Sequence, residues 1–218
     1  MKLHYVALSA FFVAPFLHAE GIQVKAKVIG SEGRLSIDGA EASLGPVKWD
    51  VGSLRSEDSS RQTATGFGAA LEFPLGDPLR IGVETSYVPF KNDSGDEVYT
   101  DLAWGGYASV DFLRQDLFSV YGTGGLGFHQ LHLADRSFLG SRVKYKDTGL
   151  LNYELGLGTR VKLSQSMDFA LELHRSDTFS RNDIDVSVEG MNLAGAGLTY
   201  KNVGLAKNEA VASLNFGF

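Results

Sequence analysis

The stretch TATGFGAALEFPLGDPLRIGVETSY, residues 63–87, alternates between two kinds of side chain on both sides of a short turn. From Phe67 to Leu75 the odd positions are mostly large and apolar, whereas most even positions are small or charged. A similar alternation continues from Leu79 to Tyr87. Successive side chains of a strand point to opposite faces, and only Gly76–Pro78 separates the two runs. The stretch therefore predicts an antiparallel hairpin with one apolar and one polar face.

The alternation recurs along most of the chain. Further runs cover residues 22–28, 102–112, 118–128, 151–163, 169–174 and 210–218. Short connections (76–78, 114–116 and 164–167) take turns with long ones (31–60, 90–98, 134–148 and 177–208). A soluble sandwich or a lipocalin-like barrel would also show such strands, but it has no reason to place every long loop at one end. The sequence therefore predicts an all-β fold, a single antiparallel transmembrane β-barrel with short periplasmic turns and long extracellular loops.

Eight strands account for these runs, and a barrel of ten strands is the alternative. Residues 184–200 keep the alternation and offer an extra strand, which would need a second extra strand, for instance within 34–43. Ten strands would then put the short turns outside the cell. We therefore expect eight strands, with residues 183–201 in a large fourth loop or in strand extensions above the membrane.

The polar face of the predicted strands carries acids and bases in mixture. Its charged members and its histidine are Lys25, Lys27, Glu72, Arg80, Glu84, Asp101, Asp111, Glu154, Arg160, Glu172 and His174. This set is too charged for the core of a soluble domain, whereas the groups can pair in the narrow polar lumen of a membrane barrel. Eight strands close around their side chains, which argues against a wide diffusion pore.

The chain begins with a segment typical of export. One lysine, an apolar run from Leu3 to Leu17 and a small residue at Ala19 predict a signal peptide over residues 1–19, cleaved after Ala19, which leaves a barrel domain over residues 20–218. Without Lys2 the 20 Lys and Arg become 19 against 26 Asp and Glu, a net charge of about −7. Such a chain lacks the basic face that a nucleic-acid partner requires. It has no cysteine, and therefore no disulfide.

Several motifs resemble a known family. TGFGAALEF (65–73), LAWGGYASVDF (102–112), SVYGTGGLGF (119–128), YELGLGTRVKL (153–163) and the terminal NFGF (215–218) resemble the OmpA/opacity-type outer-membrane β-barrel superfamily over residues 21–218. The resemblance implies a location in the outer membrane, in contact with lipid and lipopolysaccharide. It also implies that Leu214, Phe216 and Phe218 form the C-terminal signal that the barrel-assembly machinery reads.

One pair of side chains suits catalysis. His174 and Ser176 lie two apart on a predicted strand and share a face, as a general base and a nucleophile must, and Glu172 on that face could orient the imidazole. This H-x-S element resembles the lipid A deacylase family of outer-membrane barrels. However, the strand pattern places the pair on the lumen side, away from lipid, and Asp177 stands where that family has Asn. A deacylase-like enzyme is therefore the alternative interpretation, and a protein without catalytic activity is the main one.

The remaining polar residues predict neither a metal nor a cofactor site. His129 and His132 are three apart and point to opposite faces of a strand, so they cannot hold one ion together, and we expect them at the barrel rim. The acidic residues near 93–97 and 183–189 lack the spacing of a calcium loop. The sequence thus favours a structural or surface-interaction protein whose long loops, notably 31–60 and 177–208, contact an extracellular ligand, a host surface or lipopolysaccharide.

Overall fold

The computed structural model of the protein describes residues 21–52, 61–92, 94–138, 141–189 and 196–218. The predicted signal peptide, residues 1–19 with its cleavage at Ala19, lies outside these residues. Within them, no helix is long and apolar enough to cross a membrane.

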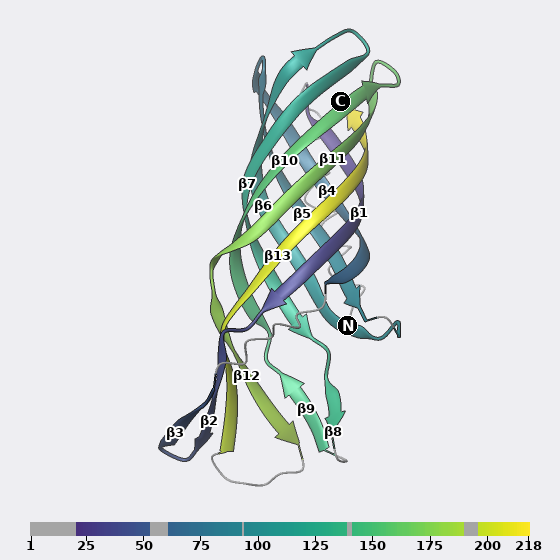
Figure 1. The fold of residues 1–218 in the computed structure, drawn as a ribbon. Helices are drawn as coiled ribbons and strands as arrows, with labels where there is room; N and C mark the ends of the chain where they lie inside the picture. The colour runs from purple at the N-terminus through teal and green to yellow at the C-terminus, as the bar shows by residue number, and fades with distance from the viewer. Residues whose placement is uncertain (1–20, 53–60, 93, 139–140, 190–195) are drawn as a thin grey trace.

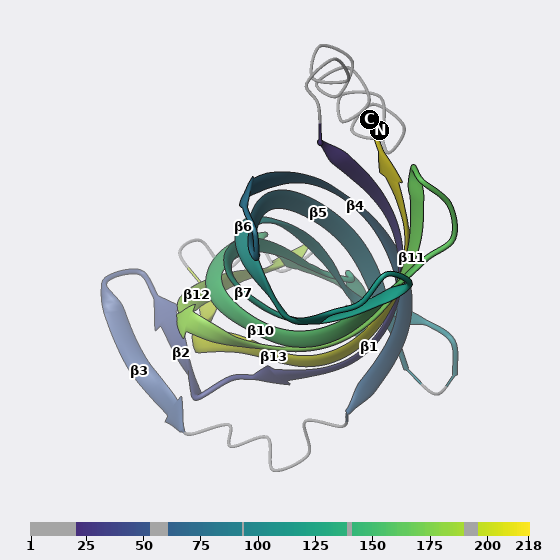
Figure 2. The ribbon, with the colours of Figure 1, turned by 90° about the horizontal axis from the view of Figure 1, so that it is seen from above.

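Eight long antiparallel strands form a closed ring, as the view along its axis shows (Figure 2). In ring order they are β1 (Gln23–Ser36), β4 (Gln62–Gly76), β5 (Leu79–Lys91), β6 (Glu97–Arg114), β7 (Phe118–Leu133), β10 (Thr148–Lys162), β11 (Met167–Ser180) and β13 (Ala196–Gly217). Closure comes from β1 and β13, which pair from Gln23↔Gly217 to Ser36↔Gly204. This ring confirms the predicted eight-stranded barrel.

Five shorter strands lie beyond the end of the ring that carries the long connections, which we call the loop end; the opposite end, with the short connections, is the turn end. They are β2 (Gly39–Leu44), β3 (Val47–Gly52), β8 (Arg136–Phe138), β9 (Ser141–Tyr145) and β12 (Asn182–Glu189). Together with the first residues of β13 they form a sheet in the order β3-β2-β13-β12-β9-β8, the loop-end sheet (Figure 1). The described residues of this segment, 183–189 and 196–201, are therefore strand extensions beyond the barrel, one of the two arrangements expected.

The outer wall of the barrel is apolar, the reverse of a soluble protein. Leu126 and Leu173 expose 69% of their surface there, and Leu157 exposes 64%. The outward run from Tyr153 on β10 to Leu163, the residue after this strand, covers ten residue steps, and a rise of about 3.3 Å per step at a tilt of about 40° gives about 25 Å. That height matches the hydrocarbon band of an outer membrane.

Aromatic side chains border this band on both sides. The girdle toward the loop end includes two ring contacts, Phe67 with Tyr87 at 5.5 Å and Trp104 with Phe128 at 5.0 Å between centroids. The girdle toward the turn end consists of Phe73, Phe112, Phe118, Phe169, Phe216 and Phe218. Aromatic rings favour the interface between lipid and water, so the two girdles mark where the barrel leaves the membrane.

One irregularity in β13 decides which side chains face inward in the loop-end sheet. Asn202 has a positive φ of 51°, and the pairing with β12 shifts there, so that Asn182 faces Val203 but Ile184 faces Tyr200. On the turn-end side of this bulge the odd residues of β13 point into the barrel. On its loop-end side the even residue Tyr200 packs against the buried core. The extra residue thus turns an apolar face inward at both levels.

Candidate functional site

The lumen near the turn end is filled by an ion cluster around Glu72, which exposes only 1% of its surface. One carboxylate oxygen lies 2.6 Å from Lys25 Nζ and accepts from the hydroxyl of Tyr107 at 3.2 Å. The other accepts from Arg80 and Arg160, each at 3.2 Å. Four donors on four strands therefore converge on one buried carboxylate, which ties β1, β5, β6 and β10 to β4.

Two tyrosines fill the space that the inward glycines leave. A Cβ at Gly82 would lie 2.4 Å from the ring of Tyr107, and one at Gly158 would lie 2.7 Å from the ring of Tyr121. Tyr121 is itself fully buried, and its ring lies 4.7 Å below the guanidinium of Arg160. The two tyrosine rings therefore occupy the room that the missing side chains of these glycines leave in the lumen.

The predicted catalytic residues lie in the middle of the lumen. The His174 ring lies between two carboxylates, with Nδ1 against Glu154 and Nε2 2.6 Å from Glu172. Glu172 also accepts from the Tyr121 hydroxyl at 2.7 Å. Ser176 is buried on the same face, and its hydroxyl has no hydrogen-bond partner among the described residues. Since both ring nitrogens already face carboxylates, neither is left to act as a base for Ser176 in this arrangement.

A third polar cluster lies closer to the loop end. Asp101 is completely buried, 2.9 Å from His129 Nδ1 and 2.8 Å from Lys207 Nζ. Lys207 also lies 3.1 Å from Glu209. His132 points outward and pairs with Asp147 at 2.6 Å, so the two histidines lie on opposite faces, as expected. The expected rim position is correct for the exposed His132 but wrong for His129, because the β7 strand continues beyond it and buries it.

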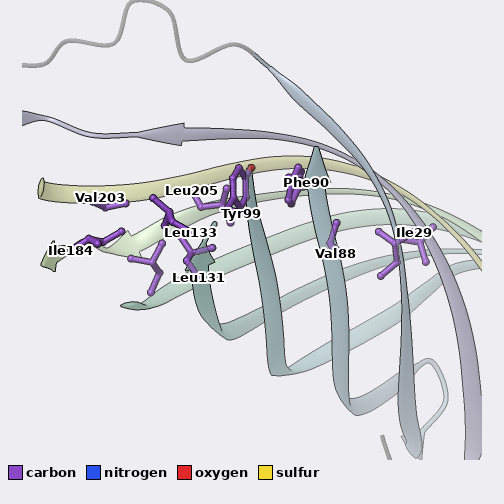
Figure 3. Packing of buried hydrophobic residues seen from close by; sticks show 11 residues of the cluster. Ile29, Val88, Phe90, Tyr99, Leu131, Leu133, Ile184, Val203 and Leu205 are labelled. Carbon is purple, nitrogen blue, oxygen red and sulfur yellow. The ribbon is translucent and has the colours of Figure 1, made fainter. Parts of the chain in front are cut away.

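Between these clusters and the loop end, the lumen is apolar. The apolar layer, which Figure 3 shows, includes Val88, Phe90, Tyr99, Leu131, Leu133, Leu150, Ile184, Val203 and Leu205, each buried. Phe90 stacks on Tyr99 with ring centroids 4.4 Å apart. Sequence reasoning missed this layer because it assigned one polar face to each whole strand. The available signal was the loss of alternation near strand ends, as at Tyr87 and Val88, where neighbouring positions are both apolar.

Charged side chains of the loop-end sheet are extensively paired. Lys201 Nζ lies 2.8 Å from Asp183, whose other oxygen accepts from the Asn202 amide at 3.0 Å. These two hydrogen bonds lower the pKa of Asp183. The hydrogen bond between Lys201 and Asp183 also raises the pKa of Lys201. Further pairs are Lys48 with Glu41, Arg181 with Asp38, and Arg142 with Asp135. The hydrogen bond from Lys48 lowers the pKa of Glu41.

The β2–β3 hairpin of this sheet leaves large apolar side chains uncovered. Val47, Trp49 and Val51 of β3 expose 59%, 47% and 54% of their surface, and Leu44 of β2 is exposed as well. Alternation puts the three β3 residues on one face, with Lys48 and Asp50 on the other. Leu44 pairs with Val47 and joins the same face. The hairpin therefore presents an apolar patch outside the membrane band.

The described residues contain no group of three or more His, Cys, Asp and Glu side chains that could hold a metal ion.

The predicted assembly residues lie at the end of β13, where Leu214, Phe216 and Phe218 point to the outer wall and are exposed. The amide of Phe218, one residue after β13, donates to the carbonyl oxygen of Ile22, one residue before β1, at 3.0 Å. The pairing between the two ends of the ring therefore continues through Phe218.

Comparison with known proteins agrees with this architecture. The family model described as "Outer membrane protein beta-barrel domain" matches residues 6–204. No curated protein matches the sequence significantly.

Three solved structures illustrate the likeness. Neisserial surface protein A is 11% identical, with 91% of this chain and 100% of that chain covered, at a TM-score of 0.55. Outer membrane protein OprG from Pseudomonas aeruginosa is 14% identical, with coverage of 92% and 97% and a TM-score of 0.49. The outer membrane protease OmpT from Escherichia coli is 10% identical, with coverage of 92% and 98% and a TM-score of 0.49. At these identities, the likeness to the neisserial protein shows the fold alone.

Proposed function

Because this chain belongs to the outer membrane protein beta-barrel domain family, we propose that it is a surface-interaction protein, in which an outer-membrane barrel anchors the loop-end sheet as a recognition platform. The main observation in support is the loop-end sheet itself. Among the described residues it has six strands, and it lies beyond the membrane band. A barrel that served only as a membrane plug would need no such structure. Strand pairing also makes the platform more rigid than a set of flexible loops.

The surface chemistry of the platform supports binding rather than mere protection of the barrel mouth. Its hairpin exposes Val47, Trp49 and Val51 together, and such a patch marks an interaction site more often than scattered apolar residues do. Its charges are largely engaged in ion pairs such as Lys201 with Asp183. A partner with both apolar and polar groups therefore fits this surface better than a purely anionic one, although lipopolysaccharide sugars and phosphates adjoin it.

The proposal assigns the loop end to the cell exterior and the turn end to the periplasm. The short turns suit passage through the membrane during assembly, and the long connections suit surface exposure. Residues 1–19 would direct export and be cleaved after Ala19, leaving the barrel domain 20–218. Leu214, Phe216 and Phe218 would then engage the barrel-assembly machinery, since they end the strand that closes the ring.

We further propose that the protein acts without catalysis and without a cofactor. His174 faces Glu154 and Glu172, and Ser176 lies inside the lumen rather than at the lipid surface. The apolar layer also separates this region from the loop end. In a lipopolysaccharide-producing host, lipid A mass spectra should be the same for the wild type, a Ser176→Ala variant and an empty control. Loss of an acyl chain with the wild type alone would establish the deacylase alternative.

Orientation can be tested first, because the chain has no cysteine of its own. A Lys48→Cys variant should react with a membrane-impermeant maleimide on intact cells, whereas an Asp116→Cys variant at the turn end should react only after permeabilisation. The reverse pattern would refute the assigned orientation.

Recognition is tested by removing the apolar patch. Cells that display the wild type, or a variant with Val47→Ser, Trp49→Ala and Val51→Ser, are compared for retention on surfaces coated with lipopolysaccharide, serum proteins or host-cell glycans. We expect the variant to lose retention on the surface that holds the wild type. If both are retained equally, the hairpin is not the contact surface.

A further inference from the structure

We propose that the barrel binds lipid A on its outer wall, where β11, β13 and β1 leave the membrane band toward the loop end. Arg175 and Asn208 hold a phosphate of this glycolipid, and a groove beside them holds its acyl chains. The choice of lipid A rests on the proposed function, which places the loop end on the lipopolysaccharide side of the membrane.

The aromatic girdle toward the loop end covers only part of the ring. Its side chains lie on five neighbouring strands, β4, β5, β6, β7 and β10, at Phe67, Tyr87, Trp104, Phe128 and Tyr153. The other three strands, β11, β13 and β1, lie side by side on one face of the barrel (Figure 1). What these three strands carry at the same level decides how this face meets the lipid headgroups.

Strand pairing gives that level. Asn208 on β13 lies ten residue steps from Phe218, just as Tyr153 lies ten steps from Leu163 along β10, so both stand about 25 Å from the turn-end edge of the band. Arg175 of β11 is paired with Asn208. This face therefore presents an arginine and an asparagine where the neighbouring strands present aromatic rings.

Both side chains have donors without an acceptor. Arg175 Nη1 donates to Asn208 Oδ1 at 3.1 Å, and this partner is uncharged. Among the described residues no carboxylate pairs with Arg175, and Asn208 Nδ2 donates to no other group. Glu32, which pairs with Asn208 from β1, has its own cation, Arg61 at 3.1 Å. A positive charge with a planar fork of free donors fits the oxygens of a phosphate.

The wall beside Arg175 is hollowed toward the turn end. A groove crosses the outer wall, and its end on this face is lined by Leu173, Ala210 and Gly30 and reaches Arg175. The large side chains of Leu173 and Phe67 stand on strands three spacings, or about 14 Å, apart, and β13 and β1 between them carry small ones. This width admits more than one acyl chain. A lipid with several chains and a phosphate on its headgroup, as in lipid A, therefore fits both parts of the site.

The headgroup contact is tested with the full-length protein, refolded in a nonionic detergent and titrated with bisphosphorylated lipid A, while native mass spectrometry gives the bound fraction. Arg175→Gln should weaken binding about tenfold. Arg175→Lys keeps the charge but loses the fork, and should fall between the two. The control is Arg114→Gln, which removes an exposed arginine at the turn end and should bind like the wild type. The heat-dependent shift on gels checks that each variant is folded.

The groove is tested separately by filling it. Ala210→Phe should weaken binding about tenfold, equivalent to the loss of about two buried methylene groups. Val83→Phe, which places the same ring on the outer wall of β5 outside the groove, should have no effect. Lipid A stripped of its phosphates should bind the wild type as weakly as bisphosphorylated lipid A binds Arg175→Gln.

Three results would overturn the proposal: equal affinity of the wild type and Arg175→Gln, an equal loss in Arg114→Gln, or no preference for the phosphorylated lipid. Tighter binding of phosphatidylglycerol than of lipid A would overturn lipid A as the occupant. These affinities do not depend on orientation in the cell. A negative result here therefore leaves the recognition platform standing, whereas the maleimide experiment can refute the assigned orientation on its own.

Discussion

Replacing Glu72 by Gln should destabilise the barrel more than any other single loss of charge in the lumen. The side chain keeps its shape, but the negative charge shared by Lys25, Arg80 and Arg160 disappears. Lys25 and Arg160 are themselves buried, at 1% and 4% exposure, so they cannot turn to water for compensation. Breaking a buried ion pair by removing one partner costs about 3–5 kcal/mol, and here several cations lose it together.

The matched control is Glu84→Gln on the neighbouring strand. Among the described residues Glu84 pairs with Lys27 alone, and 24% of its side chain is exposed. Its loss therefore leaves one buried cation without its partner instead of three, and should cost less than the loss of Glu72. Both variants are measured by denaturant titration of the barrel refolded in lipid vesicles, with tryptophan fluorescence and the heat-dependent shift on gels as probes. If Glu72→Gln costs no more than Glu84→Gln, the cluster around Glu72 is not what holds the strands together, and the reasoning fails.

Further predictions concern the outer wall, the apolar layer and the loop-end sheet. Leu155→Arg, at a position with 61% exposure on the outer wall, should cost about 2–4 kcal/mol because the charge enters lipid, whereas Leu44→Arg, at 49% exposure in the loop-end sheet, should leave the free energy of unfolding nearly unchanged. Equal effects would place the membrane band elsewhere. Phe90→Ala should cost about 3–5 kcal/mol by leaving a cavity in the apolar layer, while Phe179→Ala, at 76% exposure, should have little effect; denaturant titration compares the two. The lowered pKa of Asp183 means that its contacts stabilise the fold above its ordinary pKa of 3.8 and are lost as pH falls through the lower folded value. Hydrogen exchange of the β12–β13 amides, corrected for intrinsic rates, should therefore accelerate in the wild type below about pH 4. In Asp183→Asn these amides should exchange at neutral pH as fast as those of the wild type do in acid, and their corrected rates should not change when the pH is lowered. An acid response that persists in Asp183→Asn would assign it to another group.

The sequence by itself determined the barrel. Alternation of period two is a local property, so residues 63–87 already carry the hairpin, its apolar outer face and its charged inner face. The unequal lengths of the connections then distinguish a membrane barrel from a soluble one, and the inward position of His174 follows from its apolar neighbours. None of these conclusions required knowing which strands meet across the lumen.

Only the tertiary structure decided which inward residues pair. Glu72 and Arg160 are 88 positions apart, and Asp101 and Lys207 are 106 apart, so their contacts depend on the stagger of the closed ring. The bulge at Asn202 likewise reverses the parity of β13 and turns Tyr200 toward the core, which alternation alone assigns to the outer wall. Both effects arise because closure of the sheet fixes register globally, while each strand's sequence specifies only its two faces.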